Sequence, residues 1–304
     1  MEIVTVFGAD GPEGHSVALR LLQMGTFKVR PLVTDPNSYL AQKLQAMGTE
    51  IVTVDLDSPS SIQEALKGAS RCYAGTITDF TARDPLQKEI QYGYRIANAC
   101  KENNIKHVVF HGSHHVHRRF GLPARHLDAK ACINDYMNEL GLPKTEIITP
   151  YYYENLLTAI QPTGSNCYKI AIPMGETSMD SMSVKQVGSI VASLFQNSQT
   201  WIGKSCPVSA ERLTIEEYAC ILTQFLYPKQ FKDARISVKT FVDSSTIPGS
   251  QDLGNMFQFW KKGSQKMNIA MTATLCPEIK TFNQWVSENK ESIISSLETK
   301  STMW

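Results

Sequence analysis

An α/β fold with a doubly wound parallel sheet is predicted for this chain by three features of its sequence. The apolar run 3–7 is followed directly by a glycine-spaced turn over residues 8–14. The next segment, 15–24, repeats apolar residues at helical spacing. Short apolar runs then alternate with amphipathic segments as far as residue 148. This alternation is typical of parallel strands joined by crossover helices.

The alternation also gives the elements of the first half in order. Ser60 or Ser61 could cap the third helix. We expect strands at residues 3–7, 27–33, 50–54, 71–77, 107–110 and 145–148, and helices at residues 15–24, 38–47, 58–67, 85–100 and 127–140.

The second half of the chain does not continue the regular alternation of strands and helices. Expected helices cover residues 184–195, 214–225, 252–260 and 281–295, and strand-like pieces cover residues 205–209 and 236–242. Thr214 and Glu217 form the capping box that opens the second of these helices. The polar tail after Leu297 is expected to fray. We therefore predict a Rossmann-like dinucleotide-binding domain over residues 1–150. A smaller α+β region over residues 151–304 is expected to contribute partly to the same sheet.

Composition excludes several classes of protein. The net charge is +1, which gives no electrostatic case for nucleic acid or a membrane surface. No apolar stretch approaches the ~18 residues of a membrane span. We expect no cleaved signal peptide, because the first predicted strand starts within the first few residues. The seven cysteines are odd in number, contain no C-x-x-C, and suit free thiols in the cytoplasm.

The glycine turn predicts a diphosphate site. Glycines allow a tight turn and a close approach of the backbone, and the N–H groups at a helix start attract an anion. The motif lies between an expected strand and an expected helix, which is the arrangement of a dinucleotide-binding βαβ unit. The alternative is a structural turn that binds no ligand.

The end of the second strand selects between cofactors. An acid there binds a ribose 2′-OH, whereas an arginine accepts a 2′-phosphate. Asp35 lies at the spacing of an NAD-type acid, and the alternative is that Asp35 and Pro36 only form a turn. Asp55, at the end of the third strand, could reach an adenine amino group or serve turn chemistry. Asp10 lies inside the glycine turn, where its charge would repel a diphosphate.

Six of the seven histidines fall between residues 107 and 126, which raises the question of a metal site. No nearby cysteine completes a zinc spacing. A solvated loop carrying Arg118, Arg119 and Arg125 is the favoured interpretation, and no metal site is predicted.

His126 and Lys130 occupy the spacing of a catalytic pair. In short-chain dehydrogenases a tyrosine and a lysine four residues apart share one helical face, where the lysine binds ribose and lowers the tyrosine pKa. Here His126 stands in the tyrosine position. A histidine is a poor substitute for a phenol as proton donor to a carbonyl, so we assign no catalytic residue.

These residues together resemble the NmrA-like family of atypical short-chain dehydrogenases, and in particular its animal NADPH-sensor members. The resemblance runs over nearly the whole chain. It is carried by residues 6–18, 25–30, 126–130, 152–157, 179–184 and 252–259.

The resemblance implies a non-catalytic NADP(H)-binding redox sensor. Such a protein changes conformation with the nucleotide, has regulatory protein partners, forms homodimers, and moves between cytoplasm and nucleus. The implied contacts are to phosphate at Gly8, Ala9, Asp10, Gly11, Pro12 and Glu13, to the 2′ side at Thr34, to the nucleotide at Thr78 and Asp79, and to ribose or nicotinamide at Lys130, Tyr152, Tyr153, Glu154 and Asn155. Glu154 and Asn155 could instead form a buried polar pair.

Three departures from the family leave the cofactor open. Thr34 replaces the arginine that binds the 2′-phosphate, Asp10 replaces a small threonine, and His111 replaces a serine. The resemblance implies NADP, whereas Thr34 and Asp35 allow NAD. Two other functions stay open: an NAD(P)H-dependent reductase of a small carbonyl compound, and an interaction scaffold that has lost its cofactor.

Overall fold

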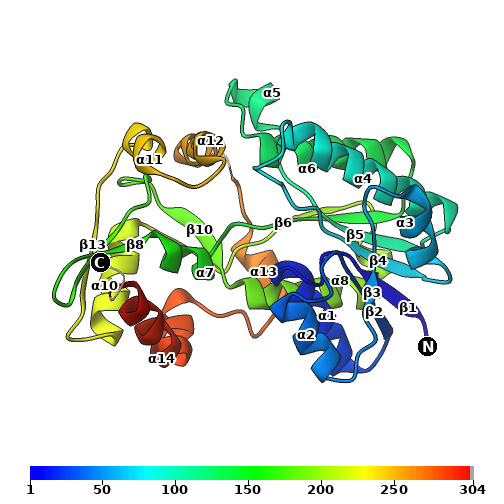
Figure 1. The fold of residues 1–304 in the computed structure, drawn as a ribbon, viewed down its shortest axis with the longest axis horizontal. Coiled ribbons are helices and arrows are strands. Elements are labelled where there is room, and N and C mark those ends of the chain that lie inside the picture. Colours follow the sequence, from blue (N-terminus) through cyan, green and yellow to red (C-terminus); the bar gives the residue numbers. More distant parts are fainter. Residues whose placement is uncertain (264, 302–304) are drawn as a thin grey trace. The chain divides into compact units, whose positions relative to one another are not determined.

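The computed structural model describes residues 1–263 and 265–301, which form two compact units (Figure 1). Unit 1 contains residues 1–149, 184–207 and 274–277. Unit 2 contains residues 150–183, 208–273 and 278–304, as far as they are described. The chain therefore enters unit 1 three times.

Unit 1 is built on a seven-stranded sheet in which every neighbouring pair of strands is parallel. The strand order is β11-β6-β5-β4-β1-β2-β3. This sheet confirms the predicted doubly wound α/β fold. The strands are β1 (Ile3–Val6), β2 (Lys28–Val33), β3 (Val52–Thr53), β4 (Arg71–Ala74), β5 (His107–His111), β6 (Lys144–Ile148) and β11 (Ser205–Pro207).

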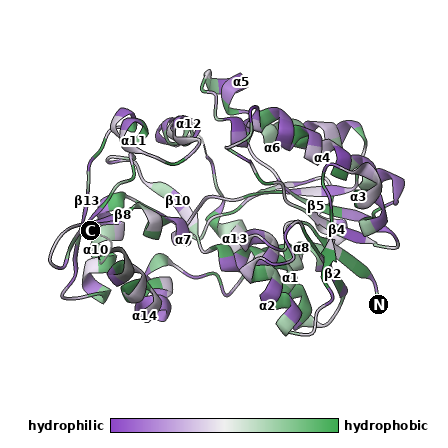
Figure 2. Ribbon diagram, viewed as in Figure 1, coloured by the Kyte–Doolittle hydropathy of each residue, from purple (hydrophilic) through white to green (hydrophobic). Residues whose placement is uncertain are grey.

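Helices cover both faces of this sheet (Figure 1). One layer contains α3 (Pro59–Leu66), α4 (Pro85–Glu102) and α6 (Arg125–Glu139), and the other contains α1 (Pro12–Met24), α2 (Tyr39–Ala46) and α8 (Val187–Gln196). The short helices α5 (Val116–Phe120) and α9 (Ser198–Trp201) complete the unit. Hydrophobic residues dominate β1 (Figure 2). Buried apolar residues of β4, β5, α4 and α6 form the core beneath the first layer.

A hydrogen-bonded contact explains why residues 184–207 belong to unit 1. The Ser16 hydroxyl in α1 donates to the Lys185 carbonyl over 2.8 Å and accepts from the Gly188 N–H over 3.0 Å. Helix α8 is thereby fixed against α1. Strand β11 then pairs with β6, so the second half of the chain contributes back to the sheet.

Unit 2 contains two three-stranded sheets and an aromatic core. The first sheet has the order β12-β10-β7 and the second β13-β9-β8. Tyr153, Tyr218, Phe282 and Trp285 pack together in this unit. Its strands are β7 (Tyr151–Tyr152), β8 (Ile160–Gly164), β9 (Cys167–Ile170), β10 (Met179–Met182), β12 (Glu211–Leu213) and β13 (Gln230–Asp233). Its helices include α7 (Tyr153–Leu156), α10 (Ile215–Phe225), α11 (Val238–Ser244), α12 (Ser250–Lys261) and α14 (Phe282–Ser301), and α13 (Ile269–Leu275) runs from unit 2 into unit 1.

Local structure differs from the expectation at three places. The predicted strand 236–242 is wrong: it contains most of α11, because the Ser237 side chain caps a helix by accepting from the Thr240 N–H. The cap of α3 is Ser58, not Ser60 or Ser61. Helix α14 continues past Leu297 to Ser301, and residues 302–304 lie outside the described part.

The capping box of Thr214 and Glu217 is confirmed. None of the helices formed by the described residues combines the length and the apolar character needed to cross a bilayer.

Candidate functional site

The glycine turn between β1 and α1 has one glycine that its backbone requires and one that packing requires. Gly8 has a φ of +66°, a left-handed conformation that disfavours other residues. A Cβ on Gly14 would lie 2.2 Å from the Gly8 carbonyl oxygen. Both glycines are therefore explained by the fold alone.

Gly11 is different. It is the N-cap of α1 with a φ of −104°, and a Cβ there would meet Gly8 O at 3.4 Å and the Ile77 side chain at 3.6 Å. These are ordinary contacts, so the protein itself tolerates a side chain at this position. A ligand that approaches the backbone closely would explain why residue 11 is a glycine.

The start of α1 suits an anion. Gly11 offers no side-chain cap and Pro12 is the first helical residue. The first-turn amides of a helix have no intrahelical acceptor, and the helix dipole adds positive charge there. The buried Ala9 lies outside this set, because its N–H donates to the Leu32 carbonyl over 3.0 Å.

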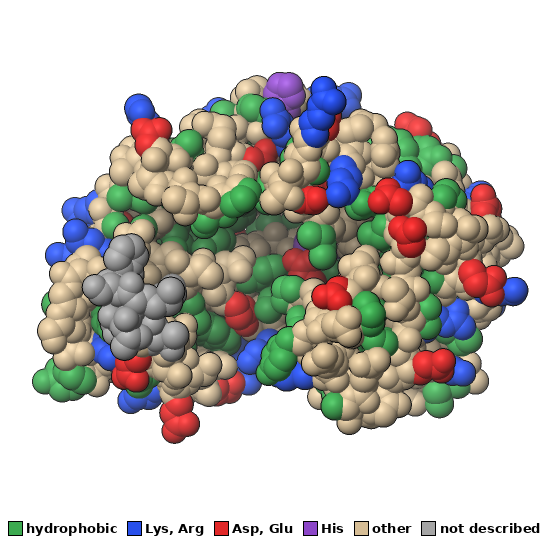
Figure 3. Space-filling model, in the orientation of Figure 1, with side chains coloured by type: hydrophobic (Ala, Val, Ile, Leu, Met, Phe, Trp, Pro, Cys, Tyr) green, Lys and Arg blue, Asp and Glu red, His purple; other side chains and the backbone are tan. Residues whose placement is uncertain are grey.

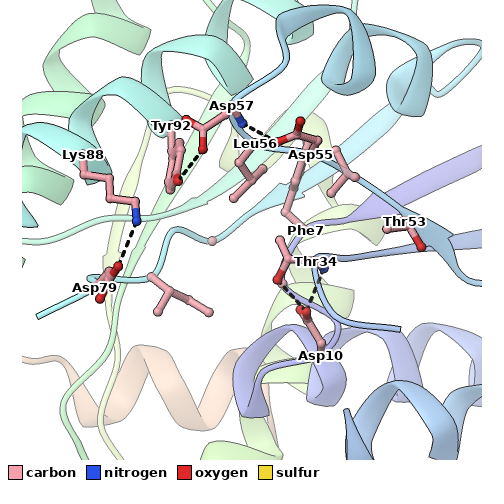
Figure 4. Close-up of a pocket in the computed structure, with 14 residues that line it drawn as sticks. Phe7, Asp10, Thr34, Thr53, Asp55, Leu56, Asp57, Asp79, Lys88 and Tyr92 are labelled. Carbon is pink, nitrogen blue, oxygen red and sulfur yellow. Dashed lines mark hydrogen bonds and ion pairs between the residues drawn. The ribbon is translucent and has the colours of Figure 1, made fainter. Parts of the chain in front are cut away.

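A pocket of about 510 Å³ lies beside this turn, at the carboxyl ends of β1 to β4 (Figure 4). It brings together five of the residues expected from the sequence: Gly8, Asp10, Thr34, Asp55 and Asp79. Its other lining residues are Phe7, Thr53, Val54, Leu56, Asp57, Gly75, Ile77, Lys88 and Tyr92. In parallel α/β sheets the carboxyl ends of the strands are where ligands bind.

The Asp10 carboxylate is directed to the end of β2 (Figure 4). Its Oδ2 accepts from the Thr34 N–H over 2.7 Å, from the Thr34 hydroxyl over 2.8 Å and from the Asp35 N–H over 2.9 Å. The negative charge of Asp10 therefore lies at the end of the second strand. Any repulsion of an anion by Asp10 is expected there and not at the diphosphate.

The other acids of the pocket have partners. Lys88 pairs with Asp79 over 2.8 Å, and Arg95 pairs with Asp57 over 3.0 Å. These contacts lower the pKa of both carboxyls, that of Asp79 through the hydrogen bond from Lys88 and that of Asp57 through the bond from Arg95. Asp55 accepts from the Asp57 N–H over 2.9 Å, which is the turn chemistry weighed for it.

Lys130 belongs to a buried network that the sequence did not predict. Its Nζ lies 2.5 Å from Oε1 of Glu89, and the Glu89 side chain is fully buried. Thr76 donates to Glu89 over 2.7 Å, and Thr78 also donates to it. Burial alone would raise the pKa of Glu89, but Lys130 and the two threonines outweigh burial and lower it. Thr78 is thus occupied in holding this carboxylate.

A sequence signal for Glu89 existed. Glu89 shares the buried face of α4 with Gly93, Ile96 and Cys100, at spacings of four, three and four residues. A carboxylate in an apolar stripe needs a partner when it is buried. The sequence does not say that the partner is Lys130.

His111, at the end of β5, forms a pair with the carboxylate of Glu13. His111 Nδ1 lies 2.8 Å from Glu13 Oε2, and His111 Nε2 lies 2.8 Å from the Thr149 hydroxyl. The side chain of Glu13 is therefore directed to His111, and only its backbone remains as the expected phosphate contact. His126, at the start of α6, packs edge-on against Phe80 with ring centroids 5.8 Å apart.

The remaining histidines are spread over several environments. His107 is buried between the hydroxyls of Ser198 and Thr145, and burial lowers its pKa to about 4. His115 pairs with Asp135 over 2.8 Å. Helix α5 carries the exposed His117, Arg118 and Arg119, and basic side chains gather over it (Figure 3). Within the described residues no group of three or more His, Cys, Asp or Glu side chains is placed to hold a metal ion.

Four of the expected cofactor contacts belong to unit 2. Tyr153 is buried in its aromatic core, where its hydroxyl donates to Glu211 over 2.6 Å, so it offers no surface to a nucleotide. Glu154 accepts from the Ser183 hydroxyl over 2.6 Å. Asn155 is exposed, which is not the environment of a buried pair with Glu154. Tyr152 is half-buried at the end of β7.

The model of the NmrA-like family matches residues 1–286, so this chain belongs to the NmrA-like family. An NmrA-like family domain-containing protein of Dictyostelium discoideum is 28% identical over 226 residues, which is 69% of this chain and 73% of that protein. An NmrA-like family domain-containing oxidoreductase of Penicillium ochrochloron is 32% identical over 51% of this chain and 49% of its own length.

Solved structures share the fold. NmrA, a negative transcriptional regulator, has been crystallised in complex with NAD and superposes with a TM-score of 0.79 at 15% identity, covering 94% of both chains. The triphenylmethane reductase of Citrobacter sp., complexed with NADP(H), has a TM-score of 0.75 at 17% identity, covering 95% of this chain and 99% of its own. Proteins that share this fold thus include a transcriptional regulator, and relatives of this chain carry oxidoreductase names.

Proposed function

We propose that this chain binds a nicotinamide dinucleotide at the pocket beside residues 8–14 and acts as a regulator, not as a reductase. Gly11 is the observation that carries the binding part. It is the glycine of the turn that neither its backbone conformation nor internal packing requires. The uncapped start of α1 and the pocket of about 510 Å³ fit a diphosphate and an adenosine, respectively.

The non-catalytic part rests on two side chains. His126 stands where the proton-donating tyrosine of short-chain dehydrogenases would stand. Lys130, which would orient the ribose, is held by the buried Glu89. A bound dinucleotide would supply hydride-transfer chemistry, and the protein would have to supply the proton. A positioned proton donor contributes about 10²–10⁴-fold to such a reaction, so its loss suits a protein that only binds.

A regulator of this kind responds through differential affinity. A dinucleotide shifts a conformational equilibrium only by the difference between its affinities for the two states. The proposal includes regulatory protein partners, a homodimer, and a cytoplasmic location with transfer to the nucleus. Imaging of the tagged chain while the cellular NADPH/NADP ratio and the NADH/NAD ratio are changed in turn would test the change of location.

Reduction of a small carbonyl compound is the second candidate. It is favoured by the retained Lys130, and several relatives carry oxidoreductase names. In that case His126 or Tyr152 would supply the proton.

Titration and turnover assays separate the candidates. Isothermal titration of the full chain with NAD, NADH, NADP and NADPH should show binding, and a screen of carbonyl and quinone substrates should show no turnover. If none of the four dinucleotides binds, the proposal is wrong. Turnover that Lys130→Met abolishes, and that the exposed control Lys67→Met leaves intact, would instead establish the reductase.

A further inference from the structure

The end of β2 already contains an anion that the protein supplies itself. We propose that Asp10 occupies the position of the 2′-phosphate and makes this pocket prefer NAD(H) over NADP(H). The inference rests on the proposed dinucleotide site and names the form of cofactor it accepts. We call Asp10, Thr34 and Asp35 the β2 clamp.

The first argument is the number of donors that converge on one oxygen. Oδ2 of Asp10 accepts from two consecutive backbone N–H groups, those of Thr34 and Asp35, and from the Thr34 hydroxyl. Consecutive backbone N–H groups form an anion-binding concavity. In a dinucleotide-binding sheet the end of this strand faces the 2′ position of the adenosine ribose. The donors available to a 2′-phosphate there are therefore already used.

The second argument is charge. The other carboxylate oxygen, Oδ1, is buried and has no hydrogen-bond partner among the described residues, so no donor offsets the charge on that side. Lys88 is the only cation among the described residues that line the pocket, and it pairs with Asp79. A second anion near Asp10 would meet uncompensated repulsion.

The third argument is that two basic side chains near β2, those of Arg30 and Lys43, are engaged elsewhere. Arg30 donates to the Ala65 carbonyl over 2.9 Å and to the Lys67 carbonyl over 2.8 Å, at the end of α3. Lys43 lies over the Tyr39 ring, 4.4 Å from its centroid. Neither of these side chains is directed to the β2 clamp.

The geometry also decides between the two acids at this strand end. Asp35 accepts from the Asn37 N–H over 2.9 Å, which is a local turn contact. Asp10 lines the pocket, whereas Asp35 does not. The acid that faces a ribose with a free 2′-OH is thus Asp10, although it comes from the glycine turn and not from the end of β2.

The test compares matched ligands on the full chain by isothermal titration. We expect NADH to bind at least about tenfold more tightly than NADPH. The repulsion between two like charges a few ångströms apart, shielded from solvent, exceeds the free energy that corresponds to a tenfold change in affinity. Asp10→Asn should reduce the difference between the affinities for NADH and NADPH. Asp10→Thr combined with Thr34→Arg should reverse the preference. Glu64→Gln, which removes an exposed charge outside this pocket, should leave the ratio unchanged.

A second measurement needs no substitution. ADP-ribose and 2′-phospho-ADP-ribose differ only at the 2′ position, so their affinities for the wild-type chain isolate the β2 clamp from the nicotinamide end. Equal affinities, or tighter binding of the 2′-phosphorylated partner in either pair, would overturn the preference while leaving the proposed dinucleotide site intact. Failure of every dinucleotide to bind would overturn both.

Discussion

The glycine turn over residues 8–14 and the Lys130 network lie in the same unit, but different parts of the chain build them. The turn is made by backbone: Gly8 supplies a left-handed conformation and Gly14 supplies space. The network is made by side chains from α4, α6 and the segment after β4, with the Glu89 carboxylate at its centre. The backbone geometry of the turn can therefore persist while the side chains of the network change.

The network should give the largest loss of stability when it is broken. Glu89→Leu would leave the Lys130 ammonium without its buried partner, and breaking one side of such a pair costs about 3–5 kcal/mol of unfolding free energy. Urea denaturation of the full chain measures the change. The double variant Glu89→Leu and Lys130→Met should recover at least half of the loss. A single-variant loss below about 1 kcal/mol would mean that the pair is not buried as described.

The second largest loss of stability is expected in the glycine turn, when Gly14 is replaced. In Gly14→Ala the new methyl group would collide with the Gly8 carbonyl, which is backbone and cannot rotate away. Overpacking of this kind costs about 1–3 kcal/mol. Thermal unfolding measures it, and wild-type stability in this variant would contradict the close packing of α1 on the turn.

The stability contributed by the Lys130 network should depend on pH, whereas that contributed by the glycine turn should not. The pKa of Glu89 is lowered below its usual 4.5, with the attraction of Lys130 and the threonine bonds outweighing burial. A depressed carboxyl pKa stabilises the fold above the unfolded-state value, and this contribution disappears as the pH falls through the folded-state value. The difference in stability between wild type and Glu89→Gln should therefore shrink below about pH 4.5.

The difference between wild type and Gly14→Ala should not change over the same range, because no proton is involved. Denaturation curves at pH 7, 5, 4 and 3.5 would show both trends. A constant Glu89→Gln difference would rule out the ionised pair.

The smallest change in stability is expected at Gly11. The Cβ of Gly11→Ala would make only ordinary contacts, so the unfolding free energy should change by no more than about 0.5 kcal/mol. Under the proposed function the affinity of this variant for dinucleotides should fall at least about tenfold, because the methyl group would occupy space that the proposed diphosphate needs. Isothermal titration beside thermal unfolding measures both. Unchanged affinity would mean that the diphosphate does not lie against this turn.

Much of the fold could be predicted because its signals are local. The apolar runs and glycine spacing placed β1, β2 and α1 within a few residues of their observed bounds. The segment 236–242 was mispredicted because its apolar residues fit a strand as well as a helix. The Ser237 cap settles it as α11.

The candidate site was predicted in part. Gly8, Asp10, Thr34, Asp55 and Asp79 do meet in one pocket. The role of Asp10 could not be predicted, because its partners lie 24 and 25 residues away. For the same reason the sequence did not indicate that Lys130 and Glu89, which lie 41 residues apart, are partners.

The sequence by itself determined the parallel sheet, the glycine turn and the position of Lys130, since periodicity and residue type act over a few neighbouring residues. Only the tertiary structure decided where the charges go. It directs Asp10 to the end of β2, Glu89 to Lys130, and Glu13 to a histidine 98 residues away. A buried charge takes whichever partner the packed elements bring within hydrogen-bonding distance, and that choice is made by the fold as a whole.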